Sequence, residues 1–264
     1  MSHSPSNSTS TPPLPTTSLP HPKIYPQFVL LGDSITQISS LTFAARLSEW
    51  YSRRLDVINR GFSGYTSRMG LEVLQQFLPA DSAPSTTTPP VKLLTVFFGA
   101  NDACVPGHPQ HVPLDTYIAS LRGIINHPAL KTHDTKVILI TPPPVDEYQL
   151  GGGDRTAAHT AKYARAAREL GEELHLPTLD LWTTFMRKAG WTEGSSGALT
   201  GSKDAPRNEV LGKLLVDGLH FTDEGYHLMY DELLDVIMHK LPDFIPEKLP
   251  MIFPDWKDKL GIEA

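Results

Sequence analysis

Three residues of the chain could together activate a hydroxyl group for attack on a carbonyl carbon. Ser34 lies in the segment "FVLLGDSIT", and Asp217 and His220 lie three residues apart in "DGLHFTDEGYHLMY". A serine hydroxyl is a weak nucleophile until a base takes its proton, and the imidazole that does so needs a carboxylate to hold one tautomer. An Asp-x-x-His pair on one turn could supply both groups. Alternatively, Ser34 caps the following helix and Asp217 caps the start of the last one.

Acyl transfer also requires hydrogen-bond donors for the developing oxyanion. Two segments could provide them: "NRGFSGYTSR", in which Gly64 could expose its backbone N–H, and "FFGANDAC", in which Asn101 carries an amide NH₂. Their ordinary uses are a turn glycine and an Asx-turn asparagine. Each segment follows a predicted strand, so we expect the groups to meet at one edge of a parallel sheet.

Short apolar runs that alternate with helical periodicity predict the elements that position these residues. The runs lie at residues 28–31, 55–58, 93–98, 137–140 and 178–181. Five strands separated by helices predict a three-layer α/β/α sandwich around a central five-stranded parallel sheet. The first run is apolar without alternation, which is typical of a strand buried on both faces. Ser34 would then stand at the carboxyl end of a central strand, where open α/β sheets bind ligands.

Three helices are predicted with specified faces. The apolar stripe of the first comprises Leu114, Ile118, Leu121 and Ile125, with Tyr117 and Ile124 beside it. A second helix, at about 155–175, has a small-residue face of Ala157, Ala161, Ala164 and Leu170. The last helix is expected to begin after an N-cap at Thr222 and to bury Met229, Leu233 and Ile237. All three would pack on the sheet.

Composition excludes several classes of protein. The net charge of −6 and the pI near 6.0 provide no basic surface for nucleic acid or an anionic membrane. The single cysteine, Cys104, excludes an intrachain disulfide and a cysteine zinc cage. No apolar run is long enough to span a bilayer, so we expect no membrane span and a cytoplasmic location. A Gly-x-Ser-x-Gly nucleophile elbow and a P-loop are both absent.

Polar segments and the carboxyl end suggest the domain boundaries. Residues 1–23 are rich in Ser, Thr and Pro and predict a disordered tail, followed by a single domain at 24–264 with a C-terminal extension from about 241. Residues 79–90 predict a surface loop. Residues 194–208 are either a mobile flap or a tolerated insertion, and their position just upstream of Asp217 could restrict the entrance to a site. The extension carries Met251, Phe253 and Trp256, which suggest a homodimer interface or a wrap onto the same subunit.

The segments "GDSIT", "GFSG", "GAND" and "DGLH" resemble, in order, the four sequence blocks of the SGNH (GDSL) hydrolase superfamily. The wider text, "NRGFSGY", "FFGANDAC" and "DGLHFTDEGYHLMYDELL", resembles its isoamyl acetate-hydrolysing esterase branch. The resemblance implies the flavodoxin-like SGNH fold, with Ser34 as nucleophile, His220 as base and Asp217 as the carboxylate that orients it. It also implies an oxyanion hole made of the Ser34 and Gly64 N–H groups and the Asn101 side chain.

The activity implied by the resemblance is hydrolysis of small carboxylic esters, such as acetate esters of short alcohols, through an acyl-enzyme. The expected partner is the ester alone, with no metal and no organic cofactor. Alternatives are a carbohydrate deacetylase, an alcohol acyltransferase and a catalytically silent binding module. Asp33 and Asp102, which flank two of the site residues, are expected to brace the loops by hydrogen bonding, and Cys104 to serve in packing.

Overall fold

The computed structural model describes residues 23–262, so the predicted tail, apart from Lys23, lies outside the described residues. Five strands form one sheet: β1 (Gln27–Gly32), β2 (Asp56–Gly61), β3 (Val91–Phe97), β4 (Lys136–Ile140) and β5 (Thr178–Leu179). All neighbouring strands are parallel, and their order is β2-β1-β3-β4-β5. The predicted five-stranded parallel sheet is confirmed, with the strand order of flavodoxin-like sheets.

Strand β1 lies inside the sheet between β2 and β3, and apolar side chains cover both of its faces. Phe28 and Leu30 belong to one core cluster, and Val29 and Leu31 belong to the other. Successive side chains of a strand point to opposite faces, so an uninterrupted apolar run is what a doubly covered strand requires. The chain leaves β1 for β2 on one side and later passes to β3 on the other. The carboxyl end of β1 is therefore the topological switch point of the sheet.

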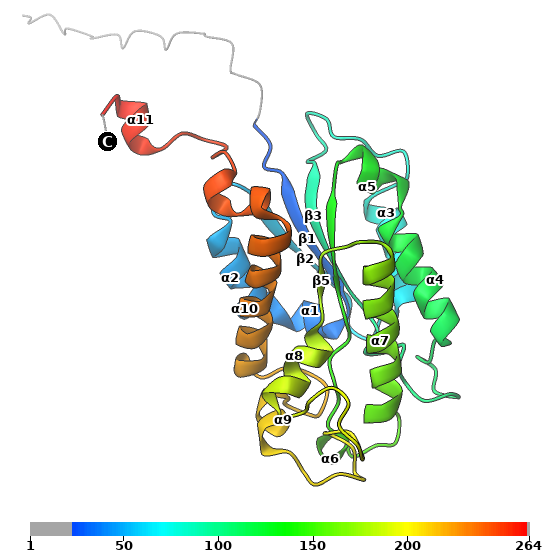
Figure 1. Ribbon diagram of the computed structural model, residues 1–264. Helices are drawn as coiled ribbons and strands as arrows, with labels where there is room; N and C mark the ends of the chain where they lie inside the picture. The colour runs from blue at the N-terminus through cyan, green and yellow to red at the C-terminus, as the bar shows by residue number, and fades with distance from the viewer. Residues whose placement is uncertain (1–22, 263–264) are drawn as a thin grey trace, which may run out of the picture.

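Helices cover both faces of the sheet in separate layers (Figure 1). One layer contains α2 (Phe43–Trp50), α8 (Leu181–Lys188) and α10 (Asp223–Lys240). The other contains α3 (Ser67–Phe77), α4 (Leu114–Ile125) and α7 (Ala157–Glu173). Shorter helices are α1 (Ser34–Ile38), α5 (Pro128–Thr132), α6 (Glu147–Leu150), α9 (Glu209–Leu214), α11 (Trp256–Leu260) and the 3₁₀ turns η1 (Ser39–Leu41), η2 (Pro242–Phe244) and η3 (Pro246–Lys248). The predicted three-layer sandwich is confirmed.

The predicted helix faces agree with the structure to different degrees. In α10 the three predicted side chains are buried, and the Thr222 side chain accepts a hydrogen bond from the Gly225 N–H as the N-cap. In α7 three of the four predicted residues are buried, but Ala161 is half-buried. In α4 the buried face is shifted from the predicted stripe toward the residues expected beside it: Leu121 is buried with Tyr117 and Ile124, whereas Ile118 and Ile125 are half-buried and Leu114 is exposed.

The C-terminal segment beyond α10 is tied to the domain at Arg53. The Ile252 N–H donates to the Arg53 carbonyl, and the Arg53 side chain donates to the carbonyl of Pro254 and pairs with Asp255 at 3.3 Å. In Figure 1 helix α11 lies at the outer end of this segment, away from the sheet. The exposed large side chains of the C-terminal segment are Met251, Phe253, Trp256, Leu260 and Ile262.

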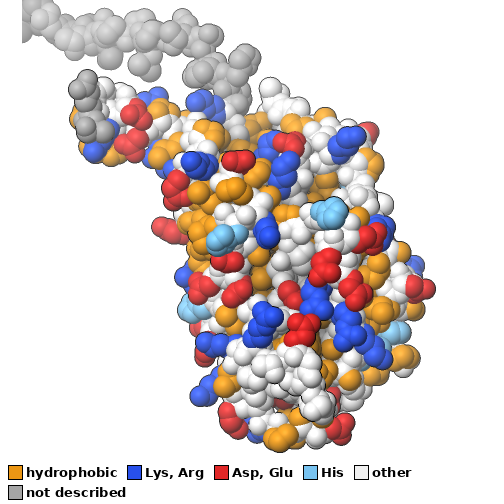
Figure 2. Space-filling model, viewed as in Figure 1, with side chains coloured by type: hydrophobic (Ala, Val, Ile, Leu, Met, Phe, Trp, Pro, Cys, Tyr) orange, Lys and Arg blue, Asp and Glu red, His pale blue; other side chains and the backbone are white. Residues whose placement is uncertain are grey.

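Charges on the visible face of the protein are mixed in sign. Figure 2 shows acidic and basic side chains interspersed, with no separate basic area on that face. Within residues 23–262, no helix combines the length and the apolar character that crossing a bilayer requires.

Candidate active site

Ser34 is the first residue of α1, directly after the carboxyl end of β1. The N-cap of this helix is Asp33, whose Oδ1 accepts the Ile35 N–H at 2.9 Å. Asp33 therefore caps this helix, which was the alternative role considered for Ser34. The Ser34 hydroxyl is instead directed at His220. Because Ser34 is the first helical residue, its N–H has no acceptor within the helix. The helix has only five residues, so any stabilisation of an oxyanion here would come from this N–H and not from a helix dipole.

The Ser34 hydroxyl, the His220 ring and the Asp217 carboxylate form one hydrogen-bonded chain. The Oγ of Ser34 lies 2.8 Å from the Nε2 of His220, and the Nδ1 of His220 lies 2.7 Å from the Oδ2 of Asp217. A carboxylate only accepts, so Nδ1 carries the proton and Nε2 is free to accept from the Ser34 hydroxyl. The three side chains thus meet in the order that base-assisted attack by serine requires.

The turn that carries Asp217 and His220 is stabilised by the same carboxylate. The Oδ1 of Asp217 accepts the backbone N–H groups of Leu219 at 3.1 Å and His220 at 2.8 Å. Burial acts to raise the pKa of Asp217, but the hydrogen bonds from His220 and Leu219 outweigh it and hold that pKa below its usual value. Since Thr222 is the N-cap of α10, Asp217 is not a cap of that helix. Its carboxylate is ionised and directed at the imidazole.

The predicted oxyanion donors lie around the same cavity. Gly64 and Asn101 line it together with Ser34 and His220. Gly64 has φ of +79°, a left-handed conformation that favours glycine. The Asn101 Nδ2 donates to the Tyr65 carbonyl at 2.9 Å. An amide nitrogen has two hydrogens, so one remains for a substrate oxygen.

The cavity is open and has a volume of about 410 Å³. Besides the predicted residues, it is lined by Ser63, Gln110, Gln149, Leu150, Arg155 and Leu219. Sequence reasoning did not predict these six as site residues. Gln149 and Leu150 come from α6, and Arg155 comes from the loop before α7. The lining is mixed, with two leucines among polar side chains.

Two buried aspartates brace the loops beneath the cavity, as expected from the sequence. Asp33 caps α1, and Asp102 accepts the Ser67 N–H at 3.0 Å and its hydroxyl at 2.5 Å, which fixes the start of α3 to the loop after β3. Burial raises the pKa of Asp33 to about 7, and it raises that of Asp102 to about 6 against the hydrogen bonds from Ser67. The pKa values of both carboxyls therefore lie near neutral pH.

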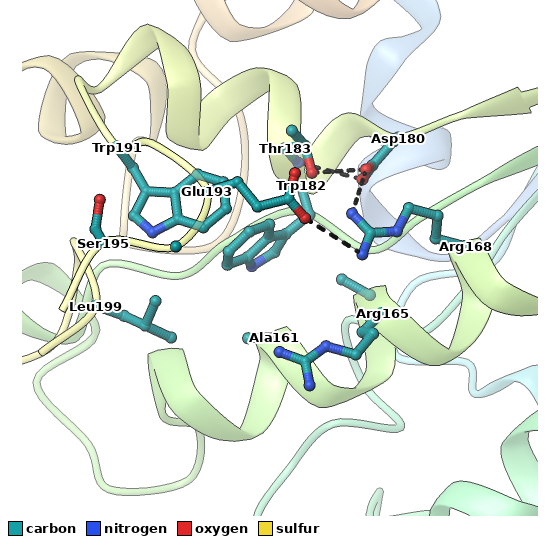
Figure 3. Close-up of a pocket in the computed structure, with 12 residues that line it drawn as sticks. Ala161, Arg165, Arg168, Asp180, Trp182, Thr183, Trp191, Glu193, Ser195 and Leu199 are labelled. Carbon is teal, nitrogen blue, oxygen red and sulfur yellow. Dashed lines mark hydrogen bonds and ion pairs between the residues drawn. The ribbon is translucent and has the colours of Figure 1, made fainter. Parts of the chain in front are cut away.

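Residues 194–208 do not line this cavity, contrary to the expectation that they could restrict its entrance. Gly194, Ser195 and Leu199 instead line a second cavity of about 290 Å³ between α7 and α8, where Figure 3 shows Trp182 and Trp191. The segment contacts α6, which lines the Ser34 cavity: the Tyr148 hydroxyl donates to the Ala205 carbonyl at 2.7 Å, and the Glu147 N–H donates to the Gly201 carbonyl at 2.8 Å.

One group of potential metal ligands occurs among the described residues: Cys104, His108 and Asp154, whose ligand atoms lie within 4.8 Å of one another. The donor set does not favour a metal ion. Asp154 already pairs with the Arg155 guanidinium at 2.7 Å, and burial raises the pKa of the Cys104 thiol to about 11, whereas a metal binds the thiolate. Cys104 is fully buried, as its expected packing role requires.

The sheet and the hydrogen-bonded Ser-His-Asp chain at its switch point define a site of the serine-hydrolase type. The sequence matches the GDSL-like Lipase/Acylhydrolase family over residues 30–228. The chain belongs to this family, and it is a carboxylic ester hydrolase.

Curated relatives support the same assignment, and solved structures share the fold. The isoamyl acetate-hydrolyzing esterase of Saccharomyces cerevisiae is 32% identical over 256 residues, which cover 89% of this chain and 96% of the relative. A GDSL esterase/lipase of Arabidopsis thaliana is 34% identical over 247 residues, covering 87% and 91%. Among solved structures, a lipase/acylhydrolase from Enterococcus faecalis has a TM-score of 0.58 at 23% identity, covering 86% of this chain and 98% of that one. An acetylxylan esterase from Geobacillus stearothermophilus has a TM-score of 0.57 at 19% identity, covering 81% and 96%.

Proposed function

We propose that the protein is a serine esterase that hydrolyses small carboxylic esters, including acetate esters of short alcohols, through an acyl-enzyme on Ser34. The observation that carries this proposal is the 2.8 Å contact between the Ser34 Oγ and the His220 Nε2, with Asp217 on the far side of the ring. The family and the similarity to isoamyl acetate-hydrolyzing esterases support the substrate class.

The reaction would have two steps. The Ser34 Oγ attacks the ester carbonyl carbon while its proton passes to the His220 Nε2, and the carbonyl oxygen becomes an oxyanion that accepts from the Ser34 and Gly64 N–H groups and the Asn101 Nδ2. When this intermediate collapses, the proton on His220 passes to the leaving alkoxide. Water then gives a proton to His220 and attacks the acyl carbon, and the proton returns to the Ser34 Oγ as the acid leaves.

The lining of the cavity supports a small acyl group. Leu150 and Leu219 are its apolar residues, so the hydrophobic contact available to an acyl chain is limited. An acetyl group needs little more than this.

A second substrate class is favoured by the polar part of the lining. Ser63 presents a hydroxyl and Gln110 an amide group that could hydrogen-bond the hydroxyls of an acetylated sugar. Acetyl esters of a saccharide are therefore the alternative substrate, with the same chemistry at Ser34.

Turnover of matched acetates tests both proposals. Isoamyl acetate, an acetylated xylose and p-nitrophenyl acetate, butyrate and octanoate are incubated with the wild type and with Ser34→Ala. The proposal predicts that the wild type prefers acetate and that Ser34→Ala loses at least about 10³-fold in kcat. A preference for the acetylated sugar selects the alternative class. If an added alcohol is converted to a new ester, the protein transfers the acyl group to alcohols. If the wild type hydrolyses none of these esters, the remaining alternative is a catalytically silent binding module.

The proposal extends to oligomeric state and location. We infer a homodimer through the C-terminal segment, because it exposes Phe253, Trp256 and Leu260 beside the domain. Sedimentation of the wild type and of Trp256→Lys/Leu260→Lys checks this: the variant should be monomeric, and a monomeric wild type refutes the dimer.

A cytoplasmic location rests on the single, buried Cys104, and fractionation of cells tests it.

A further inference from the structure

Arg155 is buried beneath the Ser34 cavity, and the mechanism above does not use it. Only 6% of the residue is exposed. It lies in the loop between α6 and α7. Its guanidinium donates hydrogen bonds to two consecutive residues of the loop after β3. The Nε donates to the Ala100 carbonyl at 2.9 Å, and the Nη2 donates to the Oδ1 of Asn101 at 3.0 Å. Asp154 accepts from the Nη1 at 2.7 Å and balances the charge.

Two contacts determine which end of the Asn101 amide faces the cavity, one with the Arg155 guanidinium and one with the Tyr65 carbonyl. An asparagine amide presents an oxygen on one side and an NH₂ on the other, and a 180° rotation exchanges them. A guanidinium has five donors and no acceptor, so only the Oδ1 can face it. The Nδ2 must then face the Tyr65 carbonyl and the cavity. Without the arginine, only the Tyr65 carbonyl would hold this orientation, and each rotation of the amide would place its oxygen where the oxyanion develops.

The same guanidinium reaches the second oxyanion loop through Gln110. The Arg155 Nη2 lies 3.5 Å from the Oε1 of Gln110, and the Nε2 of Gln110 donates to the Gly64 carbonyl at 2.8 Å. The oxygen of Gln110 thus faces the cation, and its nitrogen faces the loop after β2. Arg155 consequently links Asn101 directly, and Gly64 through one intermediate, although these two residues follow different strands.

We propose that Arg155 is a positioning residue which, together with the Tyr65 carbonyl, holds the Asn101 amide with its Nδ2 toward the developing oxyanion. The inference rests on the proposed function, because it assigns part of the oxyanion hole to Asn101. A residue that only stabilised the fold would affect the amount of folded protein. A positioning residue affects kcat in the folded protein, and only while Asn101 is present.

A double-mutant cycle separates these two roles. Arg155→Met, Asn101→Ala and the double variant are compared for kcat and KM on p-nitrophenyl acetate, and rates are normalised to folded protein. Each single variant should lose about 10–10³-fold in kcat with KM changed less than about 3-fold, because each removes the same donor from the transition state. In the Asn101→Ala background, Arg155→Met should lower kcat by less than about 3-fold. Losses that multiply in the double variant overturn the proposal.

Matched variants control for charge and for folding. Arg165→Met removes an exposed arginine of α7 that lines the second cavity (Figure 3), and it should leave kcat unchanged. Arg155→Lys keeps the charge but lacks the planar fork, so it should recover less than about a tenth of the lost rate. If Arg155→Met fails to fold, Arg155→Lys takes its place in the cycle. Full recovery by lysine would show that charge alone matters and would contradict positioning.

A readout without turnover keeps this inference separate from the proposed function. In ¹⁵N-labelled protein, the two Asn101 side-chain amide signals are assigned by their loss in Asn101→Asp. Arg155→Met or Arg155→Lys should shift or broaden these signals, because the amide is no longer held. Unchanged signals overturn the positioning role even in an active enzyme. Shifted signals in a protein that hydrolyses no ester support the positioning and refute only the proposed function.

Discussion

The Oγ of Ser34 lies 2.8 Å from the Nε2 of His220, although 186 positions separate the two residues in the sequence. Ser34 starts α1 after the central strand β1, and His220 precedes α10 in the layer on one face of the sheet. The contact therefore depends on how the turn at 217–220 sits on the sheet edge. The predictions below test that placement and its chemical consequences.

Asp217→Asn should disable the base without unfolding the protein. The amide can still accept the Leu219 and His220 N–H groups through its oxygen, but its NH₂ cannot accept the proton on the His220 Nδ1. We expect kcat to fall by about 10³–10⁴-fold, as the wrong tautomer predicts. Steady-state kinetics measure this. The control is Thr222→Ala, which removes the α10 cap, should cost about 1 kcal/mol of stability, and should leave kcat within about 3-fold.

Gly218→Ala should displace both Asp217 and His220. Gly218 has φ of +87°, and a Cβ there would lie 2.5 Å from the Asp146 carbonyl oxygen and 2.8 Å from the Leu150 nitrogen. The left-handed backbone alone costs about 1–2 kcal/mol with alanine. Thermal unfolding should show at least that loss, and kcat should fall at least about 10-fold because the turn must shift. The control is Gly190→Ala, also at positive φ but with no atom within 4 Å of its Cβ, which should lose stability alone. Equal kinetics in the two variants would contradict the account.

Leu150→Ala should strengthen the preference for acetate. Leu150 is one of the two apolar residues of the cavity, so its truncation removes apolar contact for acyl carbons beyond the acetyl group. One or two methylenes of such contact are worth about 1–3 kcal/mol of discrimination. We expect the ratio of kcat/KM for p-nitrophenyl butyrate over acetate to fall about 10-fold. Leu199→Ala, which changes the second cavity, should not alter the ratio. If both variants behave as the wild type, Leu150 does not contact the acyl group.

Asp33→Asn should change how stability depends on pH. Burial raises the pKa of Asp33 to about 7 in the folded protein, from 3.8 in the unfolded chain. Between these values the folded state binds the extra proton, so the wild type loses stability as pH rises from about 4 to about 7. Asparagine has no proton to lose. The free energy of unfolding of Asp33→Asn minus that of the wild type should increase over this range, by at most about 4 kcal/mol. Denaturant titrations at pH 4, 5.5 and 7 test the sign, and a constant or falling difference contradicts it.

The strands β1 and β4 were predictable because their buried runs are apolar without interruption, whereas the runs at 55–58 and 178–181 include Asp56 and Asp180 and mark β2 and β5 less sharply. The helix faces were also less predictable. In α4 the leucine, isoleucine and tyrosine positions allow two adjacent stripes. The stripe with Tyr117 is buried because its hydroxyl donates to the Phe98 carbonyl at 3.1 Å, a contact that no local pattern contains. The first residue, Leu114, lies at the exposed end of the helix. Periodicity specifies that a helix exists better than it specifies which face is buried.

The site was predictable only where a residue type itself implies chemistry. Ser34, Asp217, His220, Gly64 and Asn101 have such types, and the structure brings all five to one cavity. Arg155 has none, because its segment "GGGDRT" resembles an ordinary loop before a helix. Its significance arises from contacts with residues 45 and 54 positions away, which depend on the packed tertiary structure.

The central claim is that an acyl-enzyme forms on Ser34. The most direct test is to detect the mass of an acyl group attached to this residue. Wild type and Ser34→Ala are mixed with p-nitrophenyl acetate, quenched in acid within milliseconds, digested and examined by mass spectrometry. The account predicts one added acetyl group on Ser34 of the wild type, which disappears as turnover ends, and none at the equivalent position of Ser34→Ala. An acetyl group on another residue with full turnover, or undiminished turnover by Ser34→Ala, would contradict it.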